Sequence, residues 1–452
     1  MKIFNTLTRQ KEDFVPVNAG KVGIYVCGPT TYNFIHVGNA RPYVVFDTLR
    51  RYLAFSGLDV NFVQNFTDID DKIINKANEE GLDYLDIADL YVYEFLADTD
   101  GLNVQRATHY PRVTEEIDGI ISLLRDLIDK NFAYEVAGTV YFNATKADKY
   151  GKLSKKNIED LEAGARVDIN PDKRHPSDFV LWKVAKADEP SWDSPWGHGR
   201  PGWHIECSVM ARKYIGETVD IHGGGVDLMF PHHENEIAQS EAEGGNFVNY
   251  WMHNEMLLIN SQKMSKSEGD LFLVRDFAQK YGYPLLRFFL LSVHYRSPLN
   301  FSEELLDATN AGLARIKECR RNLLDAGWTG EGETQHRQAF LSALADDLNT
   351  ANAITAIFDL VKDANIALRE NAVQSAFLVD LDFMCDLLGL QLDDMNISEI
   401  DVSEIESLIV QRDEAKKVKD WALADEIRNR LADMGVEIKD TREGTKWHLT
   451  KV

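Results

Sequence analysis

Cysteine is scarce in this sequence, and long apolar runs are absent. Only four cysteines occur among 452 residues, at positions 27, 207, 319 and 385. So few thiols cannot build the disulfide framework of a secreted domain, which favours a reducing compartment. No stretch approaches the roughly 20 consecutive apolar residues of a membrane-spanning helix, and residues 1–5 lack a signal-peptide pattern. The sequence therefore predicts a cytoplasmic protein that does not cross a membrane.

Positive charge is also scarce. The chain has 49 Lys and Arg against 73 Asp and Glu, and its formal net charge is −24 at pH 7. Taken alone, this balance argues against a nucleic-acid partner, because the phosphate backbone attracts cations. Residues 403–452 differ, since their ten Lys and Arg nearly balance eleven Asp and Glu. A nucleic-acid surface, if there is one, is expected in this tail.

Composition and length indicate a multidomain globular protein. Hydrophobic residues make up 44% of the chain, and 452 residues suffice for about three domains. Local patterns predict an α/β region over residues 1–310, a helical region over about 311–400 and a small α+β tail over 401–452. The character changes over about 106–200, which we interpret as an insertion between two halves of one sheet. Beyond Pro298 we expect only helices up to the tail, where residues 436–439 and 446–449 could pair as a hairpin.

Short apolar runs predict the strands of a doubly wound α/β sheet. Residues 22–27 and 60–65 precede the insertion, and residues 219–222 and part of 249–259 follow it. We expect the glycines at 223–225 to close the third strand. Because such sheets bind ligands at the carboxyl ends of their strands, residues at these ends are site candidates.

The segment after the first strand has the pattern of a phosphate site. The strand breaks at Gly28-Pro29, and a helical pattern starts after Asn39. Free N–H groups and the helix dipole at such a helix start attract anions. His36 lies in the loop between strand and helix. An ordinary strand–turn–helix with one satisfied histidine is equally compatible with this stretch alone.

Four residues of zinc-ligand type are spread along the α/β region. His232 and Glu236 are four residues apart and therefore share a helix face, Cys27 ends a strand, and Cys207 begins a helix after the insertion. Two thiolates, an imidazole and a carboxylate suit zinc. Pairs of this kind are also common on solvated helices, and lone cysteines are usually buried apolar residues, so the residues alone leave both interpretations open. Cys319 and Cys385 are in helical patterns, and we expect them in the core.

A short basic loop follows the last predicted strand. Lys263-Met264-Ser265-Lys266-Ser267 carries two cations on a polar segment. Such a loop could close on a polyphosphate and stabilise the charge that develops as pyrophosphate leaves. The alternative is a solvated turn.

Taken together, these segments resemble the class I aminoacyl-tRNA synthetases. Residues 36–39 are similar to the HIGH signature of that class, with Asn39 in place of the second His, and residues 263–267 match its KMSKS signature. With residues 25–30, 65–71, 202–208 and 220–236 and the tail, the chain resembles the cysteinyl-tRNA synthetases from residue 3 onward. One departure follows the basic loop, where Glu268-Gly269-Asp270 replaces the Leu-Gly-Asn that is common in relatives.

The resemblance implies a Rossmann-type catalytic domain with a connective insertion, then a helical bundle and an anticodon-recognising tail. It implies ATP-dependent activation of L-cysteine, with Mg²⁺, and transfer to the 3′ end of tRNA(Cys) by a monomer that holds one Zn²⁺. The implied zinc ligands are Cys27, Cys207, His232 and Glu236. The implied catalytic residues are His36, Asn39, Lys263 and Lys266. The implied ATP contacts are His36, Gly38, Asn39, His222, Gly224, Asp227 and Lys266. The implied cysteine contacts are Thr67 and Trp203.

The chemistry of such a reaction needs positioning more than proton transfer. The cysteine carboxylate is already ionised near pH 7, so its attack on the α-phosphorus of ATP requires no general base. Zinc would select the thiol of cysteine against the hydroxyl of serine. Four protein ligands usually close a zinc site, so the substrate thiolate must add as a fifth ligand or displace a weak one, for which Glu236 is the candidate.

Two rival functions are compatible with parts of the pattern. A ligase of the same superfamily that joins cysteine to an amino sugar would share the zinc and ATP sites but should lack the tail. A non-catalytic, zinc-stabilised RNA-binding protein would not need His36 or the basic loop. Cysteine-dependent exchange of labelled pyrophosphate into ATP separates the enzymes from the binding protein.

Overall fold

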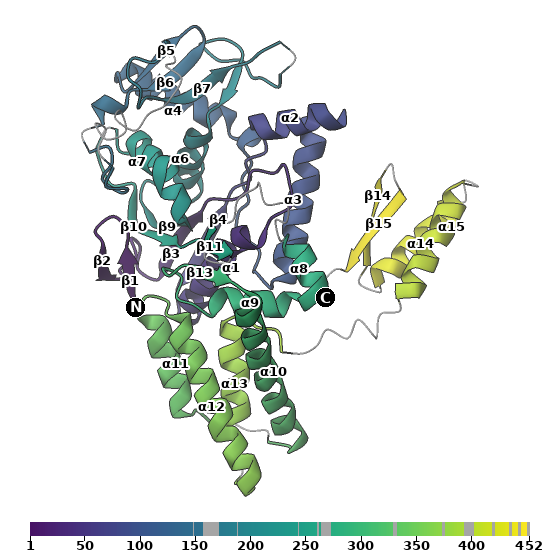
Figure 1. Cartoon of the computed structure of the whole chain (residues 1–452). Coiled ribbons are helices and arrows are strands. Elements are labelled where there is room, and N and C mark those ends of the chain that lie inside the picture. The colour runs from purple at the N-terminus through teal and green to yellow at the C-terminus, as the bar shows by residue number, and fades with distance from the viewer. Residues whose placement is uncertain are drawn as a thin grey trace. The chain divides into compact units, whose positions relative to one another are not determined.

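The computed structural model forms two compact units, Met1–Leu392 and Asp393–Val452, drawn in Figure 1. It describes residues 1–147, 149–156, 171–187, 189–242, 244–259, 262–263, 273–328, 332–372, 376–392, 402–417, 421–433, 436–441 and 444–449. Among the described residues, no helix combines the length and the apolar character needed to cross a membrane.

The first unit is built on a parallel four-stranded sheet with the strand order β10-β9-β3-β4. Its strands are β3 (Lys21–Val26), β4 (Asp59–Gln64), β9 (Val219–Gly225) and β10 (Val248–Asn254). Two strands come from before the insertion and two from after it, so the predicted α/β fold is confirmed. The helix α1 (Val37–Phe55) packs on this sheet with a largely buried set of side chains.

Two glycines are required by close packing at the carboxyl ends of these strands. A Cβ on Gly28 would meet the backbone oxygen of Asn65 at 1.6 Å, and a Cβ on Gly223 would meet the Phe46 ring of α1 at 2.1 Å. The prediction that the strand spans only residues 219–222 and is closed by the glycines was wrong, because Gly223, Gly224 and Gly225 are the last three residues of β9. Gly223 lets α1 lie directly on the strand.

The insertion forms its own small sheet. Its strands pair antiparallel in the order β5-β6-β7-β8: β5 (Ala133–Val136), β6 (Thr139–Phe142), β7 (Phe179–Val184) and β8 (Gly199–Pro201). The amphipathic helix α4 (Ile117–Asp129) precedes them and buries Ile120, Leu124 and Leu127. These residues and the strands share a hydrophobic core with the Cys27 and Cys207 region of the main sheet.

Four helices form a bundle at the end of the first unit (Figure 1): α10 (Glu303–Asp325), α11 (Gln335–Ala345), α12 (Thr350–Glu370) and α13 (Ala376–Leu387). Cys319 and Cys385 are 1% exposed in its core, as predicted. The buried Arg287 joins the bundle to α1, because its guanidinium donates to the carboxylate of Asp47 and to the Leu388 carbonyl. The expectation that only helices follow Pro298 was wrong, since β13 (Leu299–Phe301) pairs with β11 (Leu257–Ile259).

The remaining elements of the first unit connect these parts. They are β1 (Lys2–Asn5), β2 (Gln10–Asp13), α2 (Asp71–Glu80), α3 (Tyr84–Gly101), α6 (Trp203–Tyr214), α7 (Glu234–Ser240), β12 (Gln262–Lys263), α8 (Val274–Tyr281) and α9 (Tyr283–Leu291), with short 3-10 turns at Val113–Glu115, Ala144–Lys146 and Val226–Leu228 and a π-helical turn at Met229–His233.

The second unit combines two helices with a hairpin. Its elements are α14 (Val402–Lys417), α15 (Trp421–Asp433), β14 (Val436–Thr441) and β15 (Gly444–Leu449). The two strands pair antiparallel with Ile438 opposite Trp447, which confirms the predicted hairpin. The helices and the hairpin share a small core around Leu431 and Val436.

Candidate active site

The structure brings together the four residues of zinc-ligand type. Cys27 follows β3, Cys207 lies on α6, His232 lies in the turn before α7, and Glu236 lies on α7. Their ligand atoms all lie within 4.8 Å of one another, and none of the four side chains is more than 8% exposed. Residues that are up to 209 positions apart in the sequence therefore meet at the carboxyl end of β3.

The distances within this group match those of tetrahedral zinc. Zinc–ligand bonds of about 2.3 Å to sulfur and 2.0–2.2 Å to nitrogen or oxygen place tetrahedral ligand atoms about 3.4–3.8 Å apart. The sulfurs of Cys27 and Cys207 are 3.9 Å apart, and Cys207 Sγ lies 3.5 Å from His232 Nε2. His232 Nε2 lies 3.2 Å and Cys27 Sγ 3.8 Å from Glu236 Oε1. The residues fit a zinc ion with little rearrangement.

Burial sets the protonation of the group when it is free of metal. Burial, with the neighbouring Cys207, raises the pKa of the Cys27 thiol well above its usual value. Burial also raises the pKa of Cys207 to about 11 and lowers the pKa of His232 well below its usual value. A neutral imidazole is ready to bind a metal, whereas each thiol must release a proton to do so. Metal uptake is therefore expected to weaken as pH falls.

A second layer of histidines surrounds the group, and sequence reasoning missed most of it. His204 Nδ1 lies 2.9 Å from His232 Nδ1, and His233 Nδ1 lies 2.8 Å from His253 Nε2. Such contacts turn the other ring nitrogen of each histidine toward the pocket. The available signals were the adjacent His232-His233 pair and a histidine at the carboxyl end of β10, but neither identifies its partner.

His36 and Asn39 form the start of α1. His36 is the N-cap, and its Nδ1 accepts a hydrogen bond of 3.2 Å from the Asn39 backbone N–H. Asn39 Oδ1 accepts in return from the His36 N–H at 3.4 Å. The accepting Nδ1 leaves the proton on Nε2, which is then a donor. Gly38 fits because a Cβ there would approach His36 Nδ1 to 3.0 Å.

Arg41 fixes this helix start against the loops that follow the sheet. Its guanidinium is fully buried and donates to the carbonyls of Glu255, Met256, His294 and Ser297. Sequence reasoning did not assign it a role. It links α1 directly to the segment that leads into β11, and β11 pairs with β12, where Lys263 lies.

The other implied ATP contacts lie on β9 and just after it. His222 is fully buried, and its Nε2 lies 2.8 Å from Glu236 Oε2, so it belongs to the Cys27–Glu236 group more than to the α1 loop. Gly224 is buried beside Leu228 and His233. Asp227 is exposed in the turn that follows. Their contact with ATP remains a prediction.

The two implied cysteine contacts differ in exposure. Trp203 begins α6, is 42% exposed, and stacks on the His232 ring with 4.3 Å between centroids. Thr67 is 3% exposed, and its hydroxyl donates to the Glu206 carboxylate at 2.6 Å. Burial raises the pKa of Glu206 well above its usual value. Trp203 therefore lies beside the metal-ligand group with an open face, whereas Thr67 presents little surface.

The basic loop is only partly described. The backbone of Lys263 belongs to β12, while Lys266, Glu268 and Asp270 lie outside the described residues. Their predicted roles are not tested by this structure.

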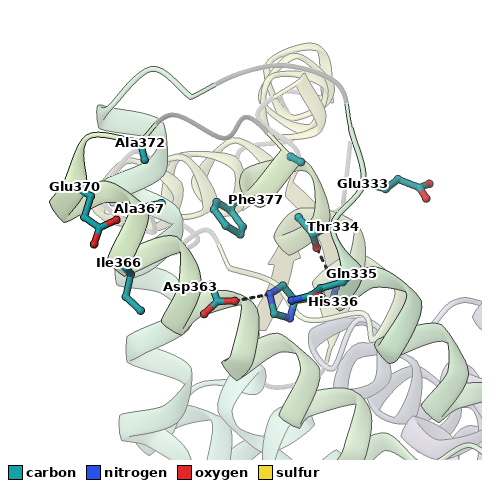
Figure 2. Close-up of a pocket in the computed structure, with 11 residues that line it drawn as sticks. Glu333, Thr334, Gln335, His336, Asp363, Ile366, Ala367, Glu370, Ala372 and Phe377 are labelled. Atoms are coloured by element: carbon teal, nitrogen blue, oxygen red, sulfur yellow. Dashed lines mark hydrogen bonds and ion pairs between the residues drawn. The ribbon is translucent and has the colours of Figure 1, made fainter.

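The helical bundle contains a separate pocket (Figure 2). This cavity of about 520 Å³ is lined by residues of α11, α12 and α13 and of the segments beside them. In Figure 2, the His336 ring points to Asp363, and its Nε2 lies 3.0 Å from Asp363 Oδ2. None of the described residues that line this pocket is a cysteine.

Three family models match the chain. A class I tRNA synthetase (C) catalytic domain matches residues 13–311, a DALR domain matches residues 339–393, and a cysteinyl-tRNA ligase anticodon-binding domain matches residues 402–447.

Full-length relatives give the same assignment. The chain is 52% identical to the cysteine–tRNA ligase of Clostridioides difficile (strain 630) over 464 aligned positions, with 99% of each chain covered. It is 52% identical to the cysteine–tRNA ligase of Lachnoclostridium phytofermentans, again over 99% of each chain, and 51% identical to that of Bacillus cereus (strain 03BB102) over 98% of each.

Solved structures support the fold. The methionyl-tRNA synthetase of Mycobacterium tuberculosis bound to methionyl-adenylate has a TM-score of 0.58 at 16% identity and covers 81% of this chain and 89% of its own. The LeuRS of Agrobacterium radiobacter K84 in its ternary complex has a TM-score of 0.57 at 12% identity, with 84% of each chain covered.

Proposed function

The chain belongs to the cysteine–tRNA ligase family, and on this premise we propose that its Cys27–Cys207–His232–Glu236 group holds one Zn²⁺ that selects cysteine. The enzyme joins cysteine to tRNA at the expense of ATP, as its full-length relatives do. The observation that carries the zinc proposal is the near-tetrahedral spacing of four buried ligand atoms.

Zinc bound at this position would keep the substrate sulfur as a thiolate and form a zinc–sulfur bond with it. The hydroxyl of serine is harder and less acidic, so it would not form a bond of the same strength. Glu236 is suited to make room for that sulfur, because the His222 ring, whose Nε2 lies 2.8 Å from Glu236 Oε2, is within reach of its second oxygen. Trp203 is proposed to cover the bound amino acid, and its stacking on His232 with nearly half of its surface open supports this role. A site that depends on one strong bond can reject an analogue by about 10⁴ or more.

The start of α1 is proposed to bind the phosphates of ATP. His36 Nε2 donates, and the N-terminal N–H groups of α1 add a partial positive charge at the same place. Asn39 holds the His36 backbone and would contact the nucleotide beside it. Lys266, supported by Lys263, is assigned to the charge that develops on the leaving pyrophosphate. Gly38, His222, Gly224, Asp227 and Thr67 complete the proposed contacts with ATP and cysteine.

The helices of residues 311–400 and the tail at 401–452 are proposed to position tRNA(Cys), with the tail reading its anticodon. The match of residues 402–447 to an anticodon-binding domain supports this role. We also propose that the protein is a cytoplasmic monomer that uses ATP with Mg²⁺.

Cysteine-dependent exchange of labelled pyrophosphate into ATP tests the activation step. Exchange should require cysteine, and serine should not replace it. Removal of zinc with a chelator should abolish exchange, and added Zn²⁺ should restore exchange. Full exchange by a protein that metal analysis finds free of zinc would contradict the zinc proposal.

Lys266→Ala tests the role of the basic loop. Removal of one charge that stabilises a transition state costs about 3–4 kcal/mol, or 10²–10³ in rate. We therefore expect a large loss in the pre-steady-state rate of adenylate formation with nearly unchanged cysteine affinity. Lys280→Ala, on the exposed side of α8, is the control for loss of a surface lysine. An unchanged rate in Lys266→Ala would exclude this role.

A further inference from the structure

Beside the proposed zinc ligands lies a second, overlapping group of metal-ligating atoms, which includes two histidines that the zinc site does not use. His222 and His233 lie beside Cys27 and Glu236, and the ligand atoms of these four residues are all within 4.8 Å of one another. Both histidines and Glu236 are fully buried. We propose that His222, His233, Cys27 and Glu236 form a second metal position, which takes a divalent ion such as Zn²⁺ or Co²⁺ more weakly than the first.

Two residues serve both positions, and their atoms face both. Glu236 Oε1 lies 3.2 Å from His232 Nε2 in the first group, while Oε2 lies 2.8 Å from His222 Nε2 in the second. The Cys27 sulfur lies 3.4 Å from His233 Nε2. A carboxylate can bind one ion through each oxygen, and a thiolate sulfur has lone pairs for two. The second position is therefore compatible with an occupied first position.

Each position has one histidine, His232 or His233, whose ring is held by another histidine. His232, in the first group, has its Nδ1 held by His204 at 2.9 Å. His233, in the second, has its Nδ1 held by His253 at 2.8 Å, and His253 in turn contacts the Thr6 hydroxyl at 2.9 Å. Outer partners of this kind fix the ring of a metal-ligating histidine. The second group thus has the same supporting layer as the first.

The distances predict weaker binding at the second position. Tetrahedral nitrogen and oxygen ligands of zinc are about 3.4 Å apart. The His222 Nε2–Glu236 Oε2 distance of 2.8 Å is shorter. The side chains must therefore shift by about half an ångström to ligate an ion. The second group also supplies one thiolate where the first supplies two.

An ion at the second position would hold Glu236 through Oε2. Under the proposed function, Glu236 loosens to admit the substrate sulfur, so a second ion should inhibit cysteine activation. Excess Zn²⁺ should slow pyrophosphate exchange by the unchanged chain more than exchange by His233→Ala. Equal inhibition of both proteins would overturn this consequence.

Metal counting tests the second position itself. The full-length chain is stripped of metal and titrated with Co²⁺ while its visible absorption is followed, and bound Zn²⁺ is counted in parallel after gel filtration. We expect two ions per chain, the second bound about tenfold or more weakly, because even the loss of an outer partner of a ligand costs 10–100-fold in metal affinity. His233→Ala should keep the first ion and lose the second, whereas His232→Ala should weaken the first. His222→Phe, which keeps an aromatic ring on Trp251, replaces His233→Ala if that variant does not fold.

The stoichiometry separates this inference from the proposed function on which it rests. One ion per unchanged chain would overturn the second position and leave the zinc proposal standing, while no bound ion would overturn both. His336→Ala is the matched control, because His336 and Asp363 form a histidine–carboxylate pair in the bundle. A second ion that is lost in His336→Ala and kept in His233→Ala belongs to the bundle and would overturn the proposal.

Discussion

Histidines contact carboxylates both in the metal-ligand group around Glu236 and in the pocket of the helical bundle, but the two surroundings differ. Around Glu236 the ligating side chains are at most 8% exposed, and two sulfurs lie within reach. In the bundle, His336 is 8% exposed, but the side chain of its partner Asp363 is 42% exposed. A buried and concentrated set of polar side chains is costly unless a ligand or metal compensates it, whereas an exposed pair is satisfied by water. The difference favours the first pocket as the metal site.

The two sites also differ in how they are assembled. The four zinc-ligand residues come from three segments that meet at the end of β3, and the outer His204 contacts one of them, His232. His336 lies in the first turn of α11, where the Thr334 side chain accepts from its backbone N–H. Its ring makes one contact across to α12. The group around Glu236 thus depends on segments far apart in the sequence, whereas the His336–Asp363 pair needs only two neighbouring helices.

Cys207→Ser should give the largest effect. A hydroxyl is a poor zinc ligand, so zinc content and cysteine activation should fall together. The zinc affinity should drop by at least about 100-fold, because even the loss of an outer partner of a ligand lowers metal affinity 10–100-fold. Zinc is measured by metal analysis and activation by pyrophosphate exchange. Cys385→Ser, in the bundle core and 1% exposed, is the matched control and should reduce only thermal stability. Full zinc content with normal exchange in Cys207→Ser would make Cys207 a core residue.

Removal of the second unit should affect a different step. A chain that ends at residue 400 retains the ligand group around Glu236 and the start of α1, so it should keep cysteine-dependent pyrophosphate exchange. It should charge tRNA poorly, with a tRNA KM raised about tenfold or more, which corresponds to about 1.4 kcal/mol of lost binding. Binding of tRNA by the full-length protein should also weaken as salt rises. Equal charging efficiency of both chains would show that the tail does not contribute to tRNA recognition.

Acid should destabilise the pocket around Glu236 in the metal-free protein. Burial lowers the pKa of His253 to about 3, while an unfolded chain binds this proton near pH 6.5. Between these values the unfolded state holds one more proton, so stability falls as pH falls, by up to about 1.4 kcal/mol per pH unit. The lowered pKa of His204, about 4 through burial, acts in the same direction.

Urea unfolding of the metal-free protein between pH 7 and 5 measures this slope. His253→Asn should flatten it, whereas His198→Asn should not, because the His198 side chain is 73% exposed. A slope that is the same in both variants would show that the buried histidines do not cause the acid sensitivity.

The sequence was sufficient to predict the parallel sheet, the insertion and the residues that meet around Glu236. Strands and helices follow from apolar periodicity, and the resemblance named residues on four separate segments. The sequence was not sufficient to predict structure that depends on contacts between residues distant in the chain. The glycines after residue 222 look like a turn until Phe46 of α1 is seen against Gly223. The three residues of β13 have no strand signal without β11 beside them.

The histidine network shows the same limit within the site. The ring of His222 contacts Glu236 in the fold, a contact that its motif does not reveal, and its contact with ATP stays a prediction. His253 had no assignment, because nothing near it in the sequence reveals that it holds His233 across the sheet. A pattern can name a ligand, but the residue that orients the ligand is chosen by tertiary packing.

His336→Ala should give the smallest effect of these changes. The variant removes one hydrogen bond to a half-exposed carboxylate, which contributes about 1 kcal/mol, so the melting temperature should fall by at most about 3 °C in a unit of this size. Zinc content and pyrophosphate exchange should stay at the level of the unchanged chain. A double-mutant cycle with Asp363→Ala isolates the pair, because each variant alone also alters local packing. If His336→Ala instead lost zinc or exchange to the extent expected of Cys207→Ser, the bundle pocket would be part of the active site. The exposure of the side chains would then no longer distinguish the His336–Asp363 pair from the ligand group around Glu236.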